Sequence, residues 1–175
     1  MAPKSLVLAA LLIVLVVAAG QVPRCSGLVA ASANSSVLVS GVVPCATGNS
    51  INAATAPVFP NAAVQLVCSG TVVARATADG NGAFLISLSN VGKGFVTAML
   101  GNQCKVVVTT PLAACDKTLA SATGTLTAPL KLLGIDTGSG SGGLDLGGII
   151  GLIDQIVGGL IGGILNLSTQ SFSLV

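Results

Sequence analysis

Short runs of alternating apolar and polar residues recur along the middle of the chain, and most of them end at a turn-forming residue. In the runs 64–68 and 84–88, alternate apolar side chains fall on one face of an extended backbone, with a period of two, whereas the runs 37–43 and 104–109 are rich in β-branched residues. The clearest runs span residues 37–43, 64–68, 84–88 and 104–109, and residues 95–100 form a further strand candidate. Repeated short strands separated by turns predict an all-β fold, a small antiparallel β-sandwich or barrel.

One turn between these runs carries acidic and amide side chains. The sequence Asp79-Gly80-Asn81-Gly82 places residues that tolerate a positive φ in succession, which is how a chain reverses between strands. Oxygen-bearing side chains at alternate positions also begin an EF-hand loop, but the later ligands of that loop, including its bidentate Glu, are absent. We therefore expect a structural turn and no metal site.

The pattern changes after residue 131. Residues 132–143 contain a Gly/Ser run that predicts a flexible linker, and residues 144–175 begin as a Gly, Ile and Leu segment. Apolar pairs recur there every three or four residues, as on one stripe of a helix, although each intervening Gly costs about 1 kcal/mol. We expect a surface-active tail whose helix forms against lipid, wax or another copy. The predicted membrane or surface contacts are Ile149, Ile150, Leu152, Ile153, Ile156, Val157, Leu160, Ile161, Ile164 and Leu165.

Two other interpretations of this segment stay open. It is long enough to span a membrane, and Gly158 and Gly162 have the spacing of small residues at a helix–helix contact, but Asp145 and Asp154 would be costly in hydrocarbon. A glycolipid-anchor signal would use the small residues at 139–141, but the end of the chain is too polar for that signal.

The composition removes most catalytic mechanisms. The chain has 175 residues, of which 52% are hydrophobic, 2% aromatic and 7% charged, so its core must be aliphatic. It has no His, and its five acidic residues are all Asp, so neither a Ser-His or Cys-His relay nor a Glu acid–base group can be assembled. We expect no enzymatic activity and no cofactor.

The N-terminus has the organisation of an export signal. Lys4 supplies a positive charge, residues 6–19 form a continuous apolar run, and small residues follow. The apolar run is short for a membrane anchor, because the hydrocarbon core of a bilayer is ~30 Å thick. Cleavage after Gly20 or after Gly27 fits this pattern.

The cysteine count distinguishes the two cleavage points. The chain has five Cys, and cleavage after residue 27 removes Cys25 and leaves an even number, as an oxidising compartment favours. We therefore predict a signal peptide at 1–27, a mature start at Leu28 and a β-domain at 28–131. Zinc binding is the rival interpretation of four cysteines, but the chain has no Cys-x-x-Cys pair and no His.

Charge and glycosylation signals complete this picture. Five Lys and Arg residues balance five Asp in the predicted mature chain, so we expect no nucleic-acid partner. Two sequons begin at Asn34 and Asn166, and we predict N-glycans at both in a secreted chain. Asn34 is the better placed, because it precedes the first strand in a polar stretch.

Five segments in fixed order carry a likeness to a known family. They are VSGVVPC at 39–45, AVQLVC at 63–68, TADGNGAF at 77–84, CKV at 104–106 and TPLAAC at 110–115. Together they resemble the pollen olive-allergen and extensin-like family, and the Gly/Leu/Ile-rich segment is similar to that of its phylloplanin-like branch. The resemblance implies the disulfides Cys45–Cys115 and Cys68–Cys104, with a third family bridge missing. It also implies a compact β-barrel or sandwich, secretion to the plant exterior and defence against microbes.

Two functions fit these observations. The leading hypothesis is a secreted plant surface protein with an antimicrobial role, deposited on the cuticle by its apolar tail. Its partners would be cuticle wax, a microbial membrane or another copy of the chain. The alternative is an extensin-like cell-wall module that binds a cell-wall component. A wall binder usually offers exposed aromatic residues or a basic patch, and the sequence predicts neither. An aliphatic barrel could also carry a small apolar ligand.

Overall fold

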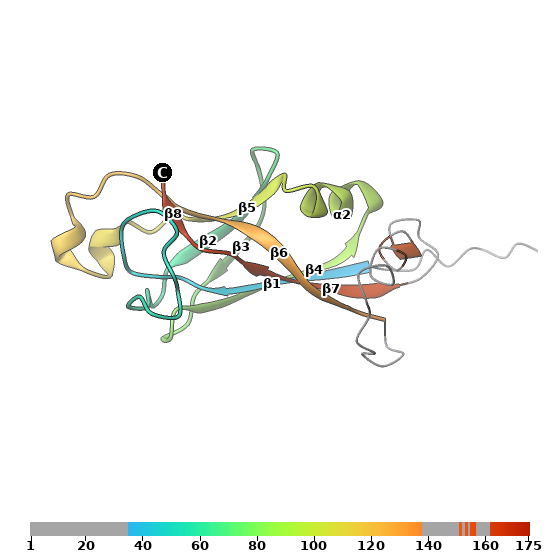
Figure 1. The fold of residues 1–175 in the computed structure, drawn as a ribbon, viewed down its shortest axis with the longest axis horizontal. Helices are drawn as coiled ribbons and strands as arrows, with labels where there is room; N and C mark the ends of the chain where they lie inside the picture. The colour runs from blue at the N-terminus through green and yellow to red at the C-terminus, as the bar shows by residue number, and fades with distance from the viewer. Residues whose placement is uncertain (1–34, 138–150, 152, 154, 157–161) are drawn as a thin grey trace, which may run out of the picture. The chain divides into compact units, whose positions relative to one another are not determined.

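The computed structural model describes residues 35–137, 151, 153, 155, 156 and 162–175, all within the compact unit Ser32–Val175 (Figure 1). These residues form one eight-stranded sheet, together with helix α2 (Lys93–Leu100) and the 3₁₀ turns η1 (Leu112–Ala114) and η2 (Lys117–Leu119). The strands are β1 Ser35–Val42, β2 Ala63–Cys68, β3 Thr71–Thr77, β4 Ala83–Val91, β5 Cys104–Val108, β6 Leu126–Asp136, β7 Gly163–Thr169 and β8 Ser173–Leu174.

The strands follow the order β3-β2-β5-β6-β7-β1-β4, and β8 pairs with β6. Every pair is antiparallel except β1 and β7, which run parallel. The sheet curls into a nearly closed barrel, and a short turn joins β3 and β4, the two ends of the strand order. This arrangement confirms the predicted all-β fold.

The core is aliphatic, as the composition requires. Along β1, Val37 and Val39 are fully buried while their neighbours are partly exposed, and β2 alternates in the same way at Val64 and Leu66. Such alternation places one face of each strand inside the barrel. Burial of these side chains stabilises the fold by roughly 25 cal/mol for each Å² of apolar surface removed from water.

The turn between β3 and β4 is structural, as expected. The Oδ1 atom of Asp79 accepts hydrogen bonds from the N–H groups of Asn81 at 2.8 Å and Ala83 at 2.9 Å. The N–H of Gly82 donates to the Asp79 carbonyl at 3.0 Å, and the φ of Gly82 is +72°. One acidic side chain therefore satisfies the donors of the reversal, which explains an Asp followed by a Gly at these positions.

The strand expected at residues 95–100 is a helix instead. Helix α2 begins after Gly92, and its buried residues Val96 and Met99 are three positions apart, which is the spacing of one helical turn. Phe95 and Val96 are adjacent apolar residues, a pattern that a strand with one solvent-exposed face does not favour. The prediction was wrong because a six-residue apolar run does not by itself distinguish a strand from a helix.

The structure also corrects the expected domain boundary and tail. Strand β6 continues to Asp136, so the first residues of the predicted linker belong to the sheet. Strand β7 lies between β6 and β1, and its residues Leu165 and Leu167 are buried in the core. The end of the predicted tail is therefore part of the barrel. The periodicity of three or four was misleading at this end, because strand pairing on both sides of β7 satisfies its backbone without a helix.

Candidate functional surface

Two disulfides brace the barrel. Cys45–Cys115 joins the chain just after β1 to the end of η1, with the two Cα atoms 6.0 Å apart. Cys68–Cys104 joins the end of β2 to the start of β5, with the Cα atoms 4.0 Å apart. Both confirm the pairing that the resemblance implied. They close sequence separations of 70 and 36 residues, so each removes conformational freedom from the unfolded chain.

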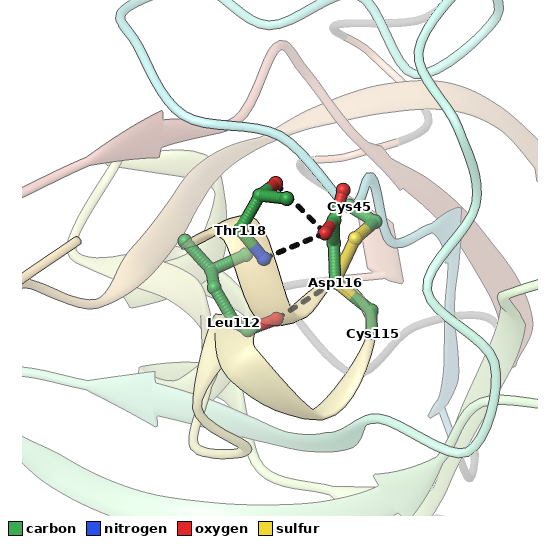
Figure 2. The surroundings of a disulfide bond; sticks show 5 residues. All are labelled: Cys45, Leu112, Cys115, Asp116 and Thr118. Atoms are coloured by element: carbon green, nitrogen blue, oxygen red, sulfur yellow. Dashed lines mark hydrogen bonds between the residues drawn. A yellow bond between two sulfur atoms is a disulfide. The ribbon is translucent and has the colours of Figure 1, made fainter. Parts of the chain in front are cut away.

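A carboxylate orders the turn beside the first disulfide (Figure 2). One oxygen of Asp116 accepts hydrogen bonds from the hydroxyl and the N–H of Thr118, both at 2.8 Å. The N–H of Asp116 donates to the carbonyl of Leu112 at 3.0 Å. The hydroxyl of Thr118, and then its N–H, lower the pKa of Asp116 below the usual value. Asp116 thus caps η2, and its role is structural.

One side of the barrel has an uncharged exterior. Strands β1, β4 and β7 contain no ionisable residue, and we call their outward-facing residues the neutral wall. On it, Leu85 stands opposite Ser40 and is 60% exposed, and Ile164 stands opposite Ser36 and is 37% exposed. Leu133, at a bulge in β6 beside β7, is 59% exposed. Aliphatic side chains and hydroxyl groups therefore share this wall.

The other side of the barrel carries cations. We call the outward-facing residues of β2, β3, β5 and residues 126–129 of β6 the basic wall, because Arg75 and Lys105 are exposed there. Lys131 is also exposed, but it pairs with Ser168 of β7 at the border of the neutral wall. The sequence analysis predicted no basic patch, and the structure corrects this. Arg75 and Lys105 lie far apart in the sequence, so only the pairing of their strands brings them onto one surface.

The predicted contact residues do not form one exposed stripe. Ile164 is exposed on the neutral wall, but Leu165 is 1% exposed because adjacent residues of a strand point to opposite faces. Ile156 is buried in the core, and Ile153 is half-buried. Leu165 and Ile156 are thus corrected from surface contacts to core residues. The other predicted contacts lie outside the described residues: Ile149, Ile150, Leu152, Val157, Leu160 and Ile161.

The structure describes the Asn residue of only one of the two sequons, Asn166. Asn166 lies in the interior strand β7, between Leu38 of β1 and Gly134 of β6, and is partly exposed. N-glycans are bulky surface groups, so this position disfavours a glycan on Asn166. Asn34 lies outside the described residues.

The described residues limit the kinds of site this chain can form. They contain no group of three side chains suited to holding a metal ion. Among them, no helix is long and apolar enough to span a bilayer. Phe59, Phe84 and Phe172 are buried and Phe95 is half-buried, and these are all the aromatic residues of the chain, so it lacks an open platform for stacking on sugars.

Ile164 was among the predicted contacts, but the exposed residues Leu85 and Leu133 were missed from sequence, although a signal for Leu85 was present. Phe84, Leu85 and Ile86 are consecutive and apolar, so in a strand the middle one must face away from the other two. Leu132 and Leu133 are also adjacent and apolar, and the alternation that exposes Pro129 and Lys131 exposes Leu133 as well.

These features define the class of protein: it is a small, disulfide-bonded, nearly closed β-barrel, and its described surface divides into a neutral and a basic wall. The chain belongs to the phylloplanin family, because a family model described as "Phylloplanin antifungal protein" matches residues 33–152. It is 39% identical over 113 residues to phylloplanin from Nicotiana tabacum, a match that covers 62% of this chain and 69% of that protein.

Proposed function

We propose that this chain is a secreted antifungal protein of the plant surface that acts by contact and not by catalysis. The family description, an antifungal protein, is the observation that carries the proposal. The chain's own residues support the contact mechanism, since it has neither His nor Glu for acid–base chemistry. Export would use the signal peptide at 1–27 and produce a mature chain starting at Leu28, which N-terminal sequencing of exported protein checks.

The neutral wall is well suited to adsorption on cuticle wax. A wax surface offers no ionic partners, so a contacting protein face should carry few charges to desolvate. Leu85, Leu133 and Ile164 are exposed on or beside strands without any ionisable residue. The apolar sequences at 144–150 and 157–161 would add to this contact, so part of the predicted tail remains in the proposal.

We also propose a wider relationship of this chain to pollen olive-allergen and extensin-like proteins. It rests on the order of the cysteines and of the strand segments that flank them. The matching alternative function, a cell-wall binding module, is less well supported, because the aromatic side chains are buried or half-buried. Binding to a cell-wall polyanion is therefore one of the outcomes that the vesicle experiment distinguishes.

The proposal is tested with the mature chain in two assays, inhibition of fungal spore germination and adsorption to wax-coated surfaces. Leu85→Ser should weaken adsorption about tenfold, since an exposed Leu that becomes buried contributes roughly 1.5–3 kcal/mol. The matched control is Val175→Ser, which removes another exposed aliphatic side chain that lies beyond β8 and outside the neutral wall. Equal adsorption of the two variants would exclude the neutral wall, and a wild-type chain that leaves germination unaffected would refute the antifungal role.

A further inference from the structure

Two cations from different strands share the basic wall. Arg75 of β3 pairs with Gln65 of β2, and Gln65 pairs in turn with Val107 of β5. In the next outward-facing row, Val67 of β2 pairs with Lys105 of β5. Residues two apart on a strand point to the same side, so Arg75 and Lys105 occupy neighbouring rows of one face, about 12 Å apart by ordinary strand spacing.

A third cation, Lys131, lies at the border of this surface. Lys105 stands opposite Pro129 of β6, and Lys131 is two residues further along that strand. Lys131 is exposed, while Leu130 between the two is buried, so Lys131 and Pro129 point outward together. Lys131 pairs with Ser168 of β7 and lies three strand positions from Arg75 on the nearly closed barrel, so a flat anionic surface contacts Arg75 and Lys105 together but not all three cations.

The described Asp side chains lie off the strands that carry Arg75 and Lys105. Asp79 lies in the turn after β3, where its oxygen accepts two backbone N–H groups, and Asp116 caps η2. Asp136 ends β6 at the side of the neutral wall, opposite Ile164. None of these three carboxylates lies on β2, β3 or β5. The balance between cations and acids in the whole chain therefore conceals a local excess of positive charge.

Aliphatic side chains lie between the cations. Val72 of β3, paired with Val67 of β2, is 36% exposed, while Val67 and Val107 are partly exposed. Cations around an aliphatic centre match a surface that is anionic outside and apolar beneath, because the long stems of Lys and Arg can lie along apolar surface with their charges in water. A polysaccharide would instead favour exposed aromatic rings, which this chain lacks.

We propose that the basic wall binds the anionic phospholipid headgroups of a microbial membrane surface. The inference rests on the proposed antifungal function and names its target and the surface that contacts it. The neutral wall, formed by other strands, would remain available for wax, so that one barrel can adhere to the plant by one wall and to the microbe by the other.

The test measures partition of the mature chain onto phosphatidylcholine vesicles with and without about one third phosphatidylserine. Arg75→Gln with Lys105→Gln should weaken binding to the anionic vesicles roughly 25-fold, since each cation near such a surface contributes about fivefold. The matched control is Lys93→Gln with Lys117→Gln, which removes the same charge from α2 and η2. The control should change binding less than about twofold, and both variants should unfold at the wild-type temperature.

Three results would overturn the inference. Equal loss in both double variants would mean that net charge, and not the basic wall, determines binding. Equal binding to neutral and anionic vesicles would mean that charge has no role. Binding to soluble polygalacturonate that depends on Arg75 and Lys105, without binding to vesicles, would assign the wall to a cell-wall polyanion. The germination assay separates the two proposals, because a chain that inhibits germination without binding vesicles keeps the function and loses this inference.

Discussion

The neutral and basic walls have the same kind of interior and different exteriors. Inward positions on both are aliphatic, such as Val37 and Val39 of β1 and Val64 and Leu66 of β2. Outward positions carry hydroxyl and aliphatic groups on one wall and cations on the other. Because successive residues of a strand point to opposite faces, the core restricts only half of each strand. The outward-facing residues of each strand are not restricted by the core, and they determine which kind of surface the barrel contacts.

The two walls also differ in how they are held. Cys68–Cys104 cross-links β2 and β5 inside the basic wall, whereas the strands of the neutral wall contain no cysteine. Cys45–Cys115 connects the two sides, since it links the chain after β1 to the segment between β5 and β6. The neutral wall therefore depends on packing and on the hydrogen bonds of β7, the strand that joins β1 to β6.

The largest effect should follow from ending the chain after residue 162, which removes β7 and β8. The sheet would open between β1 and β6, and the core would lose Leu165, Leu167 and Phe172. The whole stability of a domain is about 5–15 kcal/mol, so we expect loss of cooperative unfolding. Circular dichroism during urea titration measures this. A chain that lacks only residues 1–27 is the control and should unfold cooperatively. Retained cooperativity in the shorter chain would show that the walls do not need β7.

A smaller effect should follow from removing the bridge between the two sides by Cys45→Ala with Cys115→Ala. With a separation of 70 residues, the chain-entropy model predicts a loss of about 4 kcal/mol in the free energy of unfolding. Removing Cys68 and Cys104 in the same way, at a separation of 36 residues, should cost slightly less. Urea unfolding of both variants provides the measurement. A much larger loss for the second pair would mean that the basic wall alone sets the stability of the barrel.

The smallest effect concerns the close approach of two neutral-wall strands at Gly41 of β1. A Cβ atom there would clash with the Oγ1 atom of Thr169 and would lie 2.9 Å from the ring of Phe84. Gly41→Ala should therefore destabilise the protein by about 1–3 kcal/mol through overpacking. Gly134→Ala in β6 is the matched control, because its Cβ meets nothing within 4 Å, and it should leave stability within about 0.5 kcal/mol. Thermal unfolding compares the two, and equal stability would show that β1 and β7 can separate without cost.

Much of the fold could be predicted from local pattern. Alternation identified the strands that contain Leu66 and Phe84, and β-branched runs identified the strands that contain Val37 and Val106. The Asp-Gly-Asn-Gly sequence identified the turn before β4. These predictions succeeded because burial of one face imposes a period of two on each strand separately. The disulfides followed from the order of the cysteines in related proteins and not from their spacing in this chain. The prediction for residues 95–100 was wrong because a short apolar run fits either a helix or a strand.

What the sequence by itself determined was the all-β class, the aliphatic core, the absence of His and Glu for catalysis and the likeness to a family of secreted proteins. Tertiary structure alone decided that β7 joins β1 to β6, which converted part of a predicted tail into core. It also decided that Arg75 and Lys105 share one wall. The physical reason is that a residue's own neighbours determine its tendency to be extended, whereas strand order and register depend on packing between segments far apart in the chain.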